Sequence, residues 1–215
     1  MTPQIAQKST ATQRLPGQVH LSVVLWFLCA SVPLLCFCGV AGTLVFAEGQ
    51  SGTVSREAAE AIKALQSKDA FQRRRAFLRL EALREPATIE AIGVYLKDRD
   101  PERRAASVRS LAAVAGAPAI PVVLQKLKTD RHPSVRMAAL FSLEPFQAQD
   151  PAILPAFIET LRDRSALVRM AAVDVVSRVK DPRAKAAILA HDKIEHRPDV
   201  RKVLKGALER VKQQP

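Results

Sequence analysis

Apolar residues recur at spacings of three and four along most of the chain after residue 54. Four segments share this spacing: Ala58/Ala61/Leu65, Ile89/Ile92/Leu96, Ile120/Val123/Leu127 and Leu154/Phe157/Leu161. Because this spacing puts the apolar side chains on one face of an α-helix, each segment predicts an amphipathic helix. The segments follow one another at intervals of about 32 residues, which indicates a repeated structural unit.

A second set of helices is predicted between these segments, and each of them contains an arginine followed by small and apolar residues. They fall at residues 73–80, 104–111, 136–143, 169–176 and 201–208. Small side chains allow neighbouring helices to approach closely. Since one pair of helices cannot bury two apolar stripes by itself, successive pairs are expected to stack.

Two series of prolines mark where these helices begin. One series is Pro86, Pro118, Pro151 and Pro182, and the other is Pro101, Pro133 and Pro198, with Ala166 at the remaining place. Proline is well tolerated at the first helical position, because its missing N–H would have no partner there. Asp100, Asp150, Asp181 and Glu85, each directly before a proline, are expected to cap or favour a helix start. The pattern predicts an all-α fold, an α-solenoid of about four to five helix pairs.

The phrase Asp-x-x-Pro-x-Val-Arg-x-Ala-Ala occurs at residues 130–139, and close variants occur at 163–172 and 98–106. It resembles the short HEAT-like repeats named for the phycobilisome lyase subunits, and the resemblance covers residues 54–211. The resemblance implies stacked helix pairs and leaves the activity open, because the same repeat serves many roles.

The beginning of the chain has a different composition. Residues 1–20 form a polar tail, and no charged residue occurs in residues 21–46. A run of this length predicts one transmembrane helix, a signal anchor, in contact with the lipid bilayer. Residues 47–53 form a linker to the repeat domain at 54–211, and 212–215 form a tail. Flanking charge favours an inner-membrane, single-pass protein with a periplasmic or extracellular repeat domain. Secretion after cleavage at Ala47 is the alternative.

The five arginines of the second helices form an arginine ladder: Arg73, Arg104, Arg136, Arg169 and Arg201. Asp98, Asp130 and Asp163 recur in register with them. We expect a structural role, in which each guanidinium pairs with a neighbouring aspartate or a helix-terminal carbonyl. The alternative is an anion-binding stripe along one concave wall.

The chain has 33 basic and 21 acidic residues and a formal net charge of +12, which raises anionic partners as a possibility. Few aromatic residues accompany the basic ones, and acidic residues are interspersed. Both facts disfavour nucleic acid as a partner. An exposed binding face is expected to include the following side chains: Arg103, Arg109, Lys126, Lys128 and Lys185.

Catalytic chemistry finds no support in the residue pattern. His132 stands alone, and His191 and His196 are not spaced for one helix face, so no metal site, cofactor or catalytic residue is predicted. The favoured function is a membrane-anchored scaffold or adaptor that binds a protein partner. Two alternatives stay open: a nucleic-acid-binding basic solenoid on the cytoplasmic side, and a bilin-lyase-like or hydroxylase-like enzyme.

Overall fold

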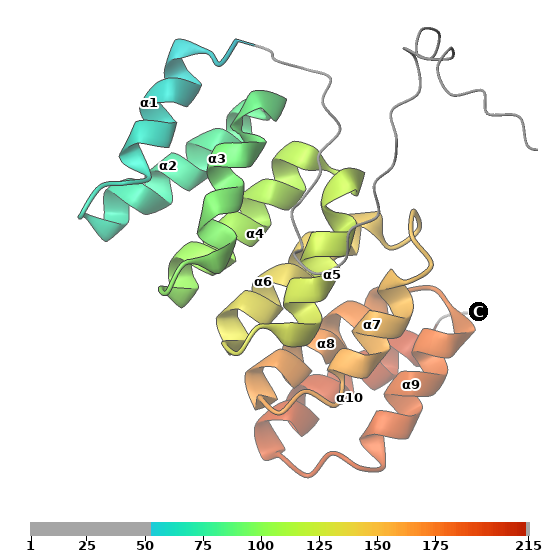
Figure 1. The fold of residues 1–215 in the computed structure, drawn as a ribbon. Helices are drawn as coiled ribbons and strands as arrows, with labels where there is room; N and C mark the ends of the chain where they lie inside the picture. Colours follow the sequence, from blue (N-terminus) through green and yellow to red (C-terminus); the bar gives the residue numbers. More distant parts are fainter. Residues whose placement is uncertain (1–52, 214–215) are drawn as a thin grey trace, which may run out of the picture. The chain divides into compact units, whose positions relative to one another are not determined.

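Five consecutive helix pairs make up residues 53–213, the part of the chain that the computed structural model describes (Figure 1). The helices are α1 (Arg56–Ala64), α2 (Ala70–Leu83), α3 (Ile89–Gly93), α4 (Pro101–Ala115), α5 (Ile120–Thr129), α6 (Pro133–Leu143), α7 (Ile153–Thr160), α8 (Ala166–Arg178), α9 (Pro182–Asp192) and α10 (Pro198–Lys212). These residues contain no strand, so the all-α prediction is confirmed.

The prolines lie at or just before the starts of helices, as predicted. Three of them precede the first residue of their α-helix: Pro86, Pro118 and Pro151, the last in a turn two residues before α7. Four helices begin on the predicted proline: α4, α6, α9 and α10. Pro86 and Pro118 instead lie in short 3₁₀ turns, Pro86–Thr88 and Ala117–Ala119, that lead into α3 and α5. A 3₁₀ turn is a common entry to an α-helix.

Two of the four expected acidic residues, Asp100 and Asp181, cap a helix, and Asp150 makes the same kind of bond in the turn that precedes α7. Side-chain oxygens of Asp100, Asp150 and Asp181 accept the backbone N–H two residues on, at 2.9, 2.8 and 2.7 Å. Such bonds satisfy N–H groups that have no partner within the helix. Glu85 differs, because its carboxylate accepts the backbone N–H of Ser55 at 3.0 Å and so fixes the start of α1.

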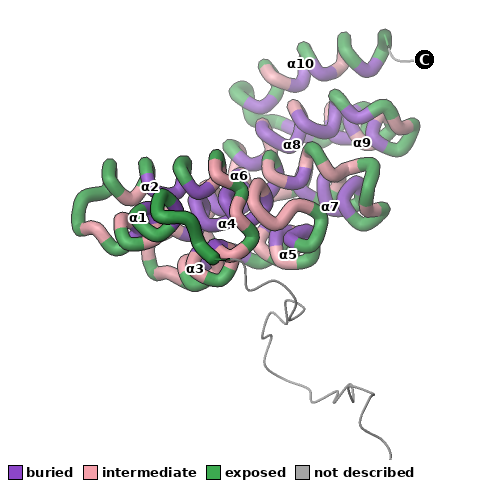
Figure 2. The backbone as a smooth tube through the Cα atoms, turned by 90° about the horizontal axis from the view of Figure 1, so that it is seen from above, coloured by how far each residue is buried: buried purple, intermediate pink, exposed green. Residues whose placement is uncertain are grey.

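The helices form two layers, with the first helix of each pair in one and the second in the other. Each second helix packs on the next, from α2 through α4, α6 and α8 to α10. Figure 2 shows the array bending toward the second helices, which therefore line its concave side. The predicted stripes are buried between the layers, with Leu65, Ile92, Val123 and Phe157 at most 1% exposed.

The predicted membrane segment, residues 21–46, lies outside the described residues, as do the tail at 1–20 and most of the linker at 47–53. Within residues 53–213, no helix combines the length and apolar character that crossing a bilayer requires.

Candidate functional site

Three arginines of the second helices bind a carboxylate of the following pair through two parallel hydrogen bonds. The bonds come from Nε and Nη2 and measure 2.9 and 2.9 Å for Arg104 to Asp130, 2.7 and 2.6 Å for Arg136 to Asp163, and 2.7 and 3.2 Å for Arg169 to Glu195. Each acid lies in the loop between the first and second helix of its pair. This bidentate geometry suits a planar guanidinium and is the strong form of an ion pair.

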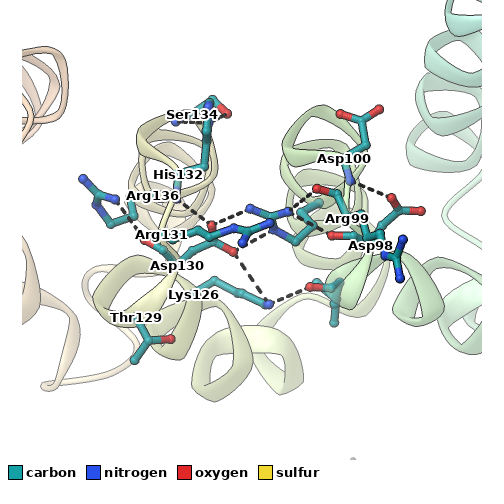
Figure 3. A network of polar contacts seen from close by, with 12 residues as sticks. Asp98, Arg99, Asp100, Lys126, Thr129, Asp130, Arg131, His132, Ser134 and Arg136 are labelled. Atoms are coloured by element: carbon teal, nitrogen blue, oxygen red, sulfur yellow. Dashed lines mark hydrogen bonds and ion pairs between the residues drawn. The ribbon is translucent and has the colours of Figure 1, made fainter.

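The same arginines also hold the loop of their own pair. Nη1 of Arg104, Arg136 and Arg169 donates to the carbonyl oxygen six residues earlier, at 2.9, 2.9 and 3.0 Å. Asp130 therefore receives Arg104 on its side chain and Arg136 on its carbonyl (Figure 3). The result is a continuous polar connection from pair to pair through the middle of the array.

The pKa values of these acids reflect their partners. Burial is the largest single influence on the pKa values of Asp130 and Asp163 and opposes their ionisation. The hydrogen bonds from Arg104 and Arg136, the backbone N–H groups of His132 and Ser165 and the nearby cations together outweigh it, so both pKa values lie below the ordinary value. The hydrogen bond from Arg169, partly opposed by burial, lowers the pKa of Glu195 to about 2. All three acids are therefore anionic at neutral pH.

Glu195 is the member of this set that the sequence interpretation missed. It stands in register with Asp130 and Asp163, and the signal that marks it is this position, about 32 residues after Asp163. It was missed because the residue at this position is glutamate, whereas the earlier repeats have aspartate there. Its longer side chain still reaches Arg169, and its Oε1 accepts the backbone N–H of Arg197 at 2.9 Å.

The ladder is broken at its first step. Asp98 occupies the loop position of Asp130, yet no ion pair joins it to Arg73 among the described residues. Its Oδ2 instead accepts Nη1 of Arg103 at 3.2 Å. Arg103 stands where the three later second helices carry a fully buried valine: Val135, Val168 and Val200. One substitution in the repeat pattern has thus redirected the aspartate.

Arg73 consequently keeps only the half of its bonding pattern that lies within its own pair. Its Nη1 donates to the carbonyl oxygens of Ser67 and Lys68 at 2.9 and 2.7 Å. Its Nε and Nη2 have no hydrogen-bond partner among residues 53–213.

A cleft of about 480 Å³ opens between α2 and α4 beside this break. We call it the α2–α4 cleft, and its lining is Ala70, Phe71, Arg73, Arg74, Phe77, Asp100, Glu102, Arg103, Ala106 and Arg109. Four arginines face two acids there, so its net charge is positive. Nε of Arg103 is buried without a hydrogen-bond partner in the described part of the chain. Phe71, 68% exposed, stands at the rim.

The solvent face of the second-helix layer also carries exposed apolar side chains. Phe71 and Leu78 lie on α2, Phe141 on α6 and Leu167 on α8. Phe141 and Leu78 occupy the same position, five residues after the ladder arginine, as the exposed Arg109 of α4. A concave side that mixes aromatic, aliphatic and arginine side chains has the composition found at protein–protein interfaces.

A family model described as HEAT repeats matches residues 47–144 and 120–209. The chain belongs to the HEAT repeat family. This confirms the repeat architecture expected from the sequence, and the helix pairs described above are HEAT repeats. No curated protein is similar enough in sequence to match the chain.

Two solved structures are similar to these HEAT repeats. A chain in the complex of CpcE and CpcF of phycocyanin lyase from Nostoc sp. PCC7120 is 21% identical, with a TM-score of 0.59. The match covers 70% of this chain and 96% of that one. An engineered protein is 17% identical with a TM-score of 0.46, and the match covers 73% of this chain and 80% of that one. At this identity, the likeness to the lyase subunit shows a shared fold.

The predicted binding face does not form a single surface. Arg103 and Arg109 lie on α4, in the concave second-helix layer, whereas Lys126 and Lys128 lie on α5 and Lys185 on α9, in the other layer. Arg109 and Lys128 are exposed, and the other three are half-buried. Lys126 was expected on an exposed face, but it is half-buried and its Nζ donates to the carbonyl oxygen of Leu96 at 2.6 Å. Burial lowers the pKa of this lysine.

Among residues 53–213, no group of three or more His, Cys, Asp or Glu side chains could hold a metal ion. His132 caps α6 by accepting the N–H of Ser134 at 3.3 Å. His191 is buried in α9, with Nε2 3.4 Å from Glu195 Oε2. Burial lowers its pKa, which keeps the ring neutral at neutral pH.

Proposed function

We propose that this HEAT protein is a scaffold or adaptor that binds a protein partner on the concave face of its second helices. The observation that carries the proposal is the exposure of Phe71, Leu78, Phe141 and Leu167 on this layer, next to exposed arginines. In the described chain, the exposed large apolar residues of the other layer, Val94 and Leu189, include no aromatic side chain. A stacked array presents such a surface on a preorganised backbone, so little ordering accompanies binding. The similar chain of phycocyanin lyase belongs to a two-protein complex, which agrees with this use of the fold.

Cross-linking from position 141 tests the proposal. Full-length protein carrying a photoreactive phenylalanine analogue at Phe141 is expected to give one discrete adduct with a partner protein in cells. The matched control is the same analogue at Gln125, an exposed position on α5 in the other layer. The partner identified in this way is then purified and titrated with the full-length chain.

In that titration Phe141→Glu is expected to weaken binding at least about tenfold, because truncating or charging a central aromatic contact removes much of the binding energy. Gln125→Glu introduces the same charge on the opposite layer and is expected to leave affinity unchanged. Equal adducts from both positions, or equal effects of both substitutions, would contradict the proposed face.

The proposal also includes anchoring by residues 21–46, with the HEAT repeats on the outer side of the inner membrane. A C-terminal alkaline phosphatase fusion is expected to be active, and mass determination of the extracted product is expected to show an intact N-terminus. Activity with a product that begins at Glu48 would replace the anchor by a cleaved signal. An expressed but inactive fusion would place the repeats in the cytoplasm and contradict the orientation.

A further inference from the structure

The α2–α4 cleft contains an arginine whose carboxylate partner is missing. At the three following steps of the ladder, Nε and Nη2 of the arginine bind both oxygens of one carboxylate at 2.6–3.2 Å. At Arg73 the same two groups have no hydrogen-bond partner in residues 53–213, and the acid at the corresponding loop position, Asp98, binds Arg103 instead. The contact of Arg73 with its own loop is the same as at the later steps, because its Nη1 donates to the carbonyl oxygens of Ser67 and Lys68.

We propose that the α2–α4 cleft binds a carboxylate of an acidic peptide segment of a partner protein, which takes the place left open beside Arg73. This rests on the proposed function and names the chemistry of the partner. The carboxylate of the partner accepts two hydrogen bonds, from Nε and Nη2 of Arg73, as the carboxylates of Asp130, Asp163 and Glu195 do at the three later steps. A planar acid is favoured because the three internal copies of this site all hold one.

The surroundings of Arg73 support an acidic rather than a neutral occupant. The cleft has two more cations at its exposed edge, Arg74 and Arg109, and a third arginine, Arg103, whose buried Nε lies 3.9 Å from Asp100 Oδ2 and has no hydrogen-bond partner among the described residues. A buried N–H donor without an acceptor is costly, and a bound carboxylate or its hydration water can supply the acceptor. Asp100 and Glu102 only partly offset the positive charge.

The wall of the cleft adds an apolar contact beside the charge. Phe71 is 68% exposed at the rim, and Phe77 below it is buried against Tyr95, with ring centroids 5.5 Å apart. Ala70 and Ala106 complete the apolar part. An apolar residue next to the acid in the bound segment therefore has a surface to pack on, and the segment is expected to be acidic and apolar rather than uniformly acidic.

The probe is a short fluorescein-labelled peptide that contains glutamates flanked by leucines, with a matched peptide in which every glutamate is glutamine. Binding to the full-length chain in detergent micelles is followed by fluorescence anisotropy. We expect the glutamate peptide to bind and Arg73→Gln to weaken it about tenfold or more, as the loss of a charge-assisted two-point contact does. Arg73→Lys keeps the charge without the planar fork and is expected to lose most of the affinity as well.

Arg201→Gln is the matched control. Arg201 holds the same ladder position in α10, and its Nη1 likewise donates to a loop carbonyl, that of Glu195 at 2.9 Å. No further helix pair follows α10 in the described chain, so no neighbouring second helix forms a cleft beside Arg201. The control removes the same charge and the same kind of loop contact, together with a 3.9 Å ion pair from Nη2 of Arg201 to Asp192, and it is expected to leave peptide binding unchanged.

Three outcomes would overturn the inference. These are equal binding of the glutamate and glutamine peptides, full affinity in Arg73→Lys, or equal losses in Arg73→Gln and Arg201→Gln. Competition by duplex DNA together with equal losses in the two variants would identify general anion attraction instead. Failure of the peptide with a preserved Phe141→Glu effect on the cross-linked partner would refute the cleft alone. If the photoreactive analogue at position 141 gives no discrete adduct with a partner protein, the proposed function itself is refuted.

Discussion

Replacing Arg136 by alanine is expected to lower the free energy of unfolding by about 3–5 kcal/mol, the usual cost of breaking a buried ion pair from one side. Arg136 is 3% exposed and makes two bonds to Asp163 and one to the carbonyl of Asp130. Its removal leaves the Asp163 carboxylate largely buried without its cation. Urea unfolding of the full-length chain, followed by circular dichroism, measures the change.

Two further variants separate the geometry of this pair from its charge. Arg136→Lys keeps the cation but not the fork, so an intermediate loss is expected. The double variant Arg136→Met with Asp163→Leu removes both charges and is expected to regain much of the lost stability, because apolar residues of similar size often replace a buried pair without cost. If Arg136→Ala changes unfolding by less than about 0.5 kcal/mol, as surface substitutions do, the ladder does not stabilise the fold.

Acid is expected to destabilise the array between about pH 5 and pH 2. Glu195 has an ordinary pKa of 4.5 and a folded pKa of about 2, so the unfolded chain binds a proton first as pH falls. Its contribution is fully present above the unfolded pKa and is lost as pH falls through the folded one. The shift corresponds to something on the order of 3 kcal/mol. Asp130 and Asp163 act in the same direction because their pKa values are also lowered.

Urea midpoints at a series of pH values measure this loss. His191 adds to it at a higher pH, because burial lowers its pKa and the unfolded chain again binds the proton first. Glu195→Gln is expected to be less stable than the natural chain at neutral pH and to show a shallower fall below pH 5. A midpoint that stays constant from pH 6 to pH 3 would show that the ladder carboxylates are not held by their arginines.

The architecture could be predicted from the sequence because its signals are local and repeated. Each proline fixes a backbone angle and each apolar stripe marks a buried face, and because both recur in register from repeat to repeat, these weak signals reinforce one another. The 3₁₀ turns that precede α3 and α5 could not be predicted in the same way. Pro86 and Pro118 mark the right places, but whether the first turn is 3₁₀ or α depends on packing that a proline does not determine.

The site was harder to predict because it arises from departures from the repeat. Pairing of Arg104 with Asp130 follows from register, whereas the separation of Arg73 from Asp98 depends on Arg103 competing for the same aspartate. Lys126 has the composition of an exposed residue, yet its long stem lies along the neighbouring repeat and its ammonium reaches a carbonyl. Neither outcome is visible from residue type without the distances.

The missing link at Arg73 also bears on how the array unfolds. In a stacked protein, cooperativity depends on the interaction between each unit and the next. The three later junctions have a two-point ion pair, while among residues 53–213 the first junction has in its place the bonds from Ser110 to Glu81, 2.8 Å long, and from the Ser55 N–H to Glu85, 3.0 Å long, beside its apolar packing. The first helix pair thus lacks the ion pair that couples each later pair to the next. An occupant of the α2–α4 cleft would add a polar contact at this junction, and a pair that opens without the rest would then be held more firmly in the cooperative array.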